Sequence, residues 1–170
     1  MVPTIAQQLQ SIRRTLAATV VPSIEADASF AREQAGLILA TLDLILDVQA
    51  SEYRYELVEH LDAQALAAAL RRLGTGADDD ESEPADPPPA DLDAIRAQTL
   101  HAKQQAEHAF AVLGETDAAD EAWRIMSAAA RRQAERELSW ARMTGFPKGP
   151  DPIAVVLDRQ SAEPAFQDAR

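Results

Sequence analysis

Three histidines and one glutamate are the residues of this chain best suited to bind a metal ion. Glu56 precedes His60 by four residues, so the two side chains can share one face of a helix. His101 and His108 are seven residues apart and can also share a face. If these two helices were neighbours, a metal site could form from Glu56, His60, His101 and His108. The chain has no Glu-x-x-His pair of the kind found in di-iron bundles, so solvated histidines on outer faces remain the other interpretation.

Asp43 and Asp47 are the second candidates, because they interrupt the most apolar run of the chain, residues 37–48. A buried carboxylate pair four residues apart could bind a ligand or cation, or act as an acid and base. The competing interpretation places both on a narrow polar stripe beside Arg54 or another arginine. Both interpretations stay open at this point.

Other chemistries find little support in the sequence. There is no cysteine, which excludes disulfides, thiolate metal sites and a cysteine nucleophile. There is no phosphate-binding glycine motif and no G-x-S-x-G turn. We therefore expect no cofactor and no identifiable catalytic residue.

Aromatic and arginine side chains are common anchors of protein interfaces. Tyr53 and Tyr55 flank Arg54 at an expected helix start, and Trp140 lies off the apolar stripe of its helix. These four residues are the candidates for a contact surface.

Apolar spacing predicts five helices that must position these residues. Their expected ranges are 4–19, 23–49, 52–73, 91–113 and 117–143. The second is apolar nearly all round, which is typical of a helix at the centre of a bundle. The fourth has a heptad-like seam, and the fifth has an expected stripe of Trp123, Met126, Ala130, Ala134, Leu138 and Ala141.

Two segments fall outside these helices. Residues 74–90 are acidic and rich in proline, which predicts a flexible, disordered linker. Residues 145–170 form an expected C-terminal tail, whose apolar patch 153–157 could pack on the bundle as an extended arm or a short helix.

The chain of 170 residues carries 16 basic and 28 acidic residues, a formal net charge of −12. More than half of this charge lies in residues 74–91, which hold seven acids and no base. Without a concentrated basic face, we expect neither nucleic acid nor an anionic membrane as partner. The first residues do not resemble a signal peptide, so a cytoplasmic protein is predicted.

The first third of the chain resembles an uncharacterised bacterial helical family encoded near aminoglycoside-phosphotransferase-like and acyl-CoA dehydrogenase genes. The similar pattern is an amphipathic helix (IAQQLQSIRRTLAATV), a proline-marked break (VVPSIEADASF) and an Ala/Leu-rich helix (AREQAGLILATLDLIL). The resemblance implies a small accessory protein with a link to acyl-CoA metabolism. It brings no catalytic residue.

Together these patterns predict an all-α protein, an up-and-down bundle of four to five helices that forms one domain, 1–170. The leading functional hypothesis is a non-enzymatic accessory or protein-interaction bundle that self-associates or binds a protein partner. The alternative is a ligand- or metal-binding bundle, with enzymatic activity left open, whose site lies among the second to fourth helices.

Overall fold

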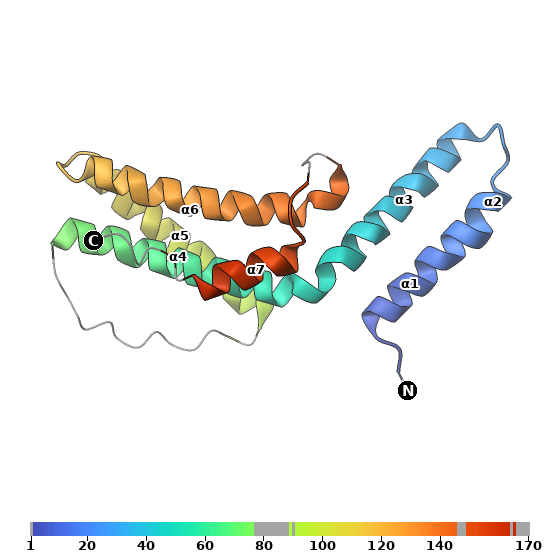
Figure 1. Cartoon of the computed structure of the whole chain (residues 1–170), viewed down its shortest axis with the longest axis horizontal. Coiled ribbons are helices and arrows are strands. Elements are labelled where there is room, and N and C mark those ends of the chain that lie inside the picture. The colour runs from blue at the N-terminus through green and yellow to red at the C-terminus, as the bar shows by residue number, and fades with distance from the viewer. Residues whose placement is uncertain (1, 77–88, 90, 146–148, 164, 166–170) are drawn as a thin grey trace. The chain divides into compact units, whose positions relative to one another are not determined.

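The computed structural model describes residues 2–76, 89, 91–145, 149–163 and 165, and every regular element in them is a helix (Figure 1). The all-α class is therefore confirmed. The longer helices are α1 (Ile5–Thr15), α3 (Ser29–Val48), α4 (Glu52–Thr75), α5 (Leu92–Leu113), α6 (Ala119–Trp140) and α7 (Ile153–Ala162). Short elements complete the set: a π-helical turn (Leu16–Val20), α2 (Val21–Ser23), and 3-10 turns at Gln49–Ser51 and Arg142–Thr144.

The helices group into two compact units. The first unit comprises Met1–Glu52 and Leu138–Pro152, and the second comprises Tyr53–Glu137 and Ile153–Arg170. The sequence predicts one bundle over 1–170 in which the segments before and after the acidic linker share a core. The observed division does not fall at that linker, whose residues 77–88 and 90 lie outside the described residues.

In the first unit, the N-terminal helical segment continues past its expected end. Thr4 caps α1 through a capping box with Gln7, as the sequence favours. The break expected before Pro22 comes later, because Pro22 occupies the first turn of α2, where a missing N–H is tolerated. The chain becomes extended at Ile24, and α3 returns beside α1 as the second arm of a helical hairpin (Figure 1).

The expectation that the apolar helix 23–49 sits at the centre of a bundle is wrong. Within α3 only Ala35, Leu42 and Val48 are buried, and α1 has no buried residue. Leu37 and Ile38 remain 56% and 52% exposed. The hairpin covers α3 only in part, so several of its apolar side chains face solvent.

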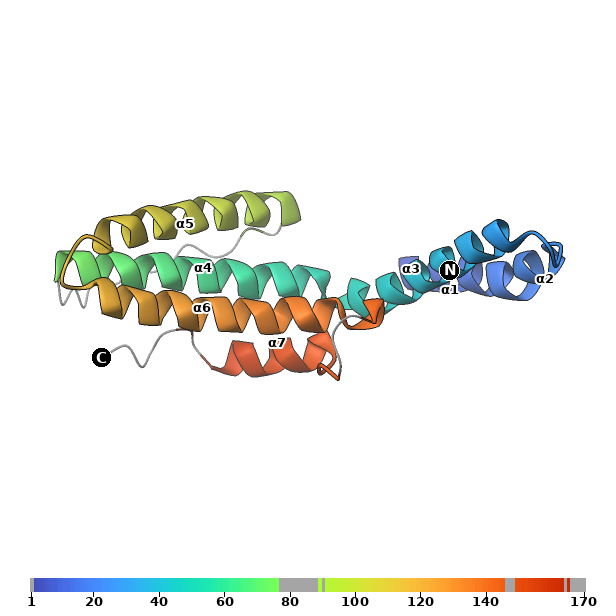
Figure 2. The same ribbon diagram turned by 90° about the horizontal axis from the view of Figure 1, so that it is seen from above.

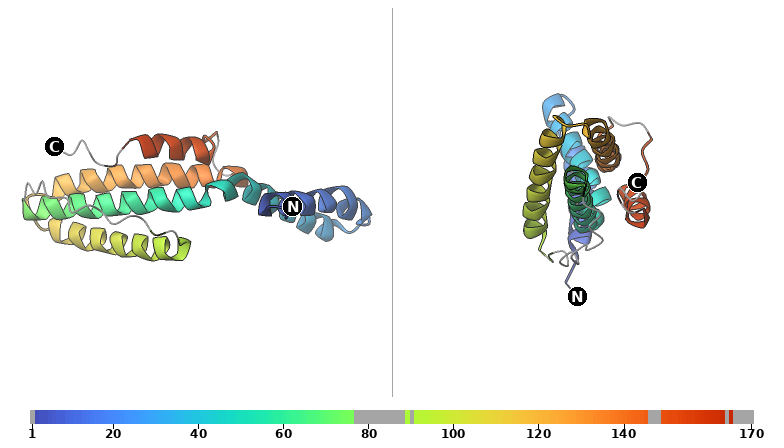
Figure 3. Two further views of the ribbon diagram at one scale, coloured as in Figure 1. Left: turned by 90° about the horizontal axis from the view of Figure 1, so that it is seen from below. Right: turned by 90° about the vertical axis from the view of Figure 1, so that its left-hand side faces the viewer.

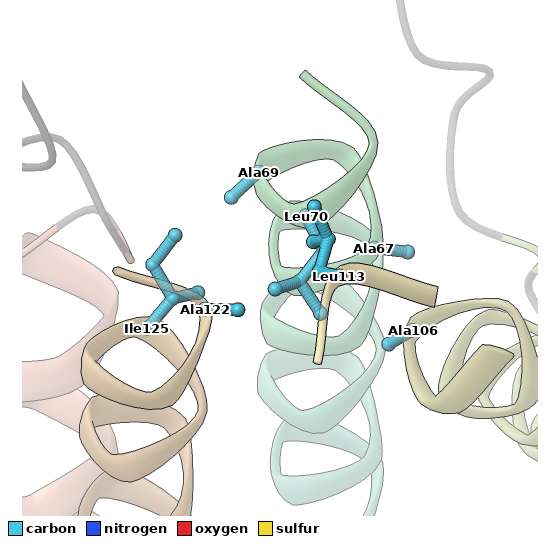
Figure 4. Close-up of a cluster of buried hydrophobic side chains, with 7 residues drawn as sticks. All are labelled: Ala67, Ala69, Leu70, Ala106, Leu113, Ala122 and Ile125. Atoms are coloured by element: carbon cyan, nitrogen blue, oxygen red, sulfur yellow. The ribbon is translucent and has the colours of Figure 1, made fainter. Parts of the chain in front are cut away.

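In the second unit, α4, α5 and α6 lie side by side, and α7 packs beside them (Figures 2 and 3). Alanines and leucines from α4, α5 and α6 form a buried cluster (Figure 4). The heptad-like seam predicted for α5 is confirmed in its buried members Ile95, Thr99, Ala102, Ala106 and Leu113.

Helices α4 and α5 run parallel, which departs from the antiparallel order expected of chain neighbours. Glu56 contacts Arg96 near the start of both helices, and Gly74 lies near Leu113 at their ends. A parallel pair needs a connection that returns along the full length of α4, about 36 Å for its 24 residues. The 14 residues 77–90 can reach about 46–50 Å when extended. The long acidic segment is therefore sufficient to make the crossover.

The apolar stripe predicted for α6 is on the wrong face. Trp123 and Leu138 are 61% and 52% exposed. The buried face holds Ala122, Ile125, Arg136 and Ser139 instead. Together with the half-buried Ala129 and Arg132, these positions follow three- and four-residue steps, but three of the six are polar, so hydrophobicity alone selects the wrong stripe.

Within the expected tail, residues 153–162 form helix α7, so an extended conformation is wrong for this part. Ile153, Val156 and Leu157 are at most 2% exposed. A short helix lets all three, at spacings of three and one, face the bundle together. Residues 164 and 166–170 lie outside the described part of the chain.

We expect Leu70→Ala to destabilise the second unit, because Leu70 is fully buried in the cluster of Figure 4. Removing such a side chain costs about 2–5 kcal/mol of unfolding free energy. Urea unfolding followed by circular dichroism measures this loss. The matched control Leu100→Ala, on exposed α5 surface, changes stability by about 0.5 kcal/mol or less. Equal losses in the two variants would contradict the assigned core.

Candidate functional site

Arg136 of α6 is the centre of a buried network of charged side chains in the second unit. Its side chain is only 3% exposed. The guanidinium donates to Glu59 Oε2 from Nη2 at 2.8 Å and from Nε at 3.2 Å. It also donates to Asp62, one turn further along α4, and to Gln160 Oε1 of α7 at 2.7 Å. One side chain therefore joins three helices.

Arg132 extends this network by one helical turn. Its Nε donates to both carboxylate oxygens of Asp62, at 3.0 and 2.8 Å, and its Nη2 donates to the carbonyl of Gln160. The amide of Gln160 returns a hydrogen bond to the carbonyl of Arg132 at 3.0 Å. These reciprocal bonds fix the register of α7 against α6.

Lys103 brings α5 into the same network by donating to Glu59. Burial alone would raise the pKa of Glu59, but the hydrogen bonds from Lys103 and Arg136 outweigh it and hold that pKa below its usual range. Burial would likewise lower the pKa of Arg136, whereas Asp62 and Glu59 raise it. Glu59 and Arg136 therefore remain charged near neutral pH.

A cavity of about 140 Å³ lies beside this network, between α4, α5 and α6. Its charged part includes Glu59, Asp62, Lys103 and Arg136. Its remaining walls are the apolar side chains Ala63, Leu66, Ala106, Met126 and Ala129, together with Glu107 and Gln133. The cavity thus combines a charged wall with an apolar one.

His60 is buried rather than solvated. It is 1% exposed, and its Nδ1 lies 3.4 Å from Thr99 Oγ1. The hydroxyl of Thr99 already donates to the carbonyl of Ile95, so its oxygen can accept a hydrogen bond from the tautomer of His60 that carries its hydrogen on Nδ1. Burial lowers the pKa of His60, which favours the neutral imidazole.

The four predicted metal ligands are not brought together. Glu56 accepts from Arg96 Nε at 2.8 Å, and His101 forms an exposed hydrogen bond with Gln105. His108 is exposed on α5. Within the described ranges, no group of three or more His, Asp or Glu side chains could hold a metal ion. Solvated outer positions are confirmed for His101 and His108, whereas for His60 that interpretation is wrong.

Asp43 and Asp47 of the first unit each pair with an arginine. Asp43 accepts a two-pronged pair from Arg13, which lowers the pKa of its carboxyl. Asp47 accepts from Arg142, with Nε to Oδ2 at 2.8 Å, and this pairing raises the pKa of Arg142. The structural interpretation is therefore confirmed with different partners from Arg54, and no buried acid–base pair forms.

The predicted contact residues fall in different surroundings. Tyr53 is 44% exposed, whereas Tyr55 and Trp140 are half-buried. Burial, together with the charge of Glu59, raises the pKa of Tyr55 to about 12. Arg54 binds α7 instead, through Asp158 at 2.5 Å and Ser161 at 3.4 Å. These residues do not form one common exposed surface.

A different surface is exposed and apolar, on a side of α3 distinct from that of Ala35 and Leu42, whereas the buried Val48 continues this surface at the end of the helix. We name it the α3 apolar stripe, and it consists of Phe30, Leu37, Ile38 and Ile45. At 100° per residue, the four positions fall within about 100° of the helix circumference. Their exposed fractions range from 37% to 72%. Among the described residues, the helical stretch Ser29–Thr75 also meets the length and composition needed to cross a membrane, a test that buried core helices also pass.

Sequence reasoning missed the charged network and the cavity. A signal was present, because Arg132 and Arg136 continue the spacing of Ala122, Ile125 and Ala129 along α6. On α4, Glu59 and Asp62 are three residues apart and can share a face. Charged residues that continue the three- and four-residue spacing of buried positions on two helices can form buried ion pairs. Which residues pair, however, depends on how the two helices pack against each other.

No family model, no curated protein and no solved structure matches this chain. What the protein does must therefore be inferred from its own residues. The fold and the sites define an all-α protein with a charged, cavity-bearing helical unit and a helical hairpin that exposes apolar side chains.

We expect Arg136→Ala to destabilise the protein by about 3–5 kcal/mol, because Glu59 and Asp62 would lose their shared partner while still buried. Urea unfolding at neutral pH measures the change. Arg131→Ala, an exposed arginine on the same helix, is the matched control and should stay within about 0.5 kcal/mol. A small effect of both substitutions would show that the network contributes little.

His60 should make stability depend on pH. Because its folded pKa lies below the ordinary value of about 6.5, the unfolded chain binds more protons between these two values. The free energy of unfolding therefore falls as the pH falls through this window and levels off below the folded pKa. Urea unfolding between pH 5 and 8 should show a weaker fall for His60→Gln than for the unaltered chain. The exposed control His108→Gln should retain the full fall, and an unchanged slope in His60→Gln would contradict the assignment.

Proposed function

We propose that this protein is a non-enzymatic interaction protein that self-associates through the α3 apolar stripe. The observation that carries the proposal is the exposure of Phe30, Leu37, Ile38 and Ile45 on one side of a single helix. Apolar patches of this kind on a folded surface mark interaction sites. The occupant proposed for this surface is a second copy of the chain.

The incomplete burial of the hairpin favours a second copy. Helix α1 buries no residue, and its apolar Ile5 and Ile12 are 72% and 55% exposed. Two helices alone enclose little apolar surface, whereas two hairpins related by a twofold axis can enclose a four-helix core. The run from Gln34 to Leu42 holds no charged residue, so two α3 helices can approach without like-charge repulsion.

The ion pairs of α3 favour a protein partner over a bilayer. Asp43 and Asp47 form ion pairs with Arg13 and Arg142. A charged side chain placed at the centre of a membrane-spanning helix costs about 2.5–3.5 kcal/mol on insertion scales. At 100° per residue, Asp43 and Asp47 lie outside the arc of the α3 apolar stripe, so a dimer interface on this stripe leaves both ion pairs accessible to water.

Size-exclusion chromatography with light scattering at high micromolar concentration tests the proposal. We expect a dimer for the unaltered chain, and at least a tenfold weaker dimer for Ile38→Lys, because the introduced charge would be buried twice in a symmetric interface. Leu100→Lys places the same charge on exposed α5 surface and should leave the dimer intact.

Two outcomes would overturn the proposal. One is a strict monomer for the unaltered chain at high micromolar concentration. The other is sedimentation with phosphatidylcholine vesicles that Ile38→Lys abolishes, which would assign the stripe to a lipid surface. Circular dichroism of each variant separates loss of association from loss of folding.

A further inference from the structure

The cavity between α4, α5 and α6 is retained although three helices could have closed it. Its apolar walls include Ala63, Ala106 and Ala129, one alanine from each helix. A larger side chain at any of these positions would reduce the space. The space is partly open to solvent, its walls forgo the contacts that a larger side chain would make, and the neighbouring buried charges carry a desolvation cost as well. Both features are explained if the space takes a ligand.

The size of the cavity limits that ligand to one small apolar group. The space of about 140 Å³ is close to the roughly 150 Å³ at which an apolar protein cavity accommodates benzene. Leu66 and Met126 offer the apolar contacts, and the unbranched thioether of Met126 can adapt to a ring.

The four residues of the charged network that line the cavity do not select the charge of the ligand. Glu59 and Asp62 already accept from Arg136, and Lys103 and Arg132 supply further donors to them. These charges are compensated within the protein. In formal charge, Lys103 and Arg136 balance Glu59 and Asp62 in the cavity lining, so these four residues favour no particular ligand charge.

Two further lining groups can still accept hydrogen bonds. Glu107 of α5 is exposed and, among the described residues, has no ion-pair or hydrogen-bond partner through its carboxylate. On α6, Gln133 donates its amide to Glu137 at 2.7 Å, which leaves its carbonyl oxygen as an acceptor. Two acceptors, one of them a carboxylate, thus line the same cavity from facing helices.

We infer that this cavity binds a small organic ammonium ion, with its apolar group between Leu66 and Met126 and its ammonium group on Glu107 and Gln133. An ammonium has three donors and no acceptor, which matches this pair of acceptors. The Glu107 carboxylate would be the main reason why the cavity prefers a cation to a neutral molecule or an anion of similar shape.

Methyl NMR of the full chain labelled with [13C-methyl]methionine tests this inference with three probes of similar shape. Benzylamine is the cation, benzyl alcohol its neutral counterpart and benzoate the anion. The chain has three methionines, and of the two that the structure describes Met126 lines the cavity and Met143 does not, so Met143 is an internal control. Met126→Leu assigns the resonance.

We expect benzylamine to shift the Met126 signal in a saturable way and to bind at least tenfold more tightly than benzyl alcohol or benzoate. Glu107→Gln should remove most of this preference, whereas the exposed control Glu115→Gln should retain it. Ala129→Leu, which fills the space, should abolish the shift in a protein that circular dichroism shows to be folded.

Equal binding of the three probes would overturn the ammonium assignment, and so would a preference that survives Glu107→Gln. No saturable Met126 shift with any probe would overturn the site itself. None of these results depends on the oligomeric state, because the α3 apolar stripe belongs to the other unit. Failure of one proposal is therefore distinguishable from failure of the other.

Discussion

The pairing of Arg136 with Glu59 and Asp62 is the constraint on which the second unit depends. A buried guanidinium is tolerated only when its donors find acceptors, so α4, α6 and α7 can pack in few registers. A shift of one residue along α6 would leave buried charges without partners. The acceptor from α7, Gln160, is itself 3% exposed, and it makes the short C-terminal helix part of the same arrangement.

The network and the cavity have one origin in the packing of α4, α5 and α6. Small residues on the facing sides let the helices approach, and charged side chains then fill one part of the interior. Lys103 completes the compensation of Glu59 from α5, which lies parallel to α4. The parallel arrangement depends on a connection long enough to return along α4, and an acidic, proline-rich segment of this length meets that requirement.

The first unit follows a different physical pattern. Its ion pairs, Arg13 with Asp43 and Arg142 with Asp47, are partly exposed and therefore contribute less to stability than fully paired buried charges. Its apolar residues outnumber the positions that the hairpin can cover. The two units thus differ: one contains buried polar pairs, and the other keeps apolar side chains of a helix exposed.

The sequence by itself determined the helical class, most helix boundaries and the seam of α5, because three- and four-residue spacing and local capping encode them. It also favoured arginine partners for Asp43 and Asp47. Only the tertiary structure decided that Arg136 is buried, that Trp123 is exposed and that residues 153–162 form a packed helix. The physical reason is that burial of a charge depends on partners from distant segments, here 24 to 77 residues away along the chain, which local spacing cannot specify.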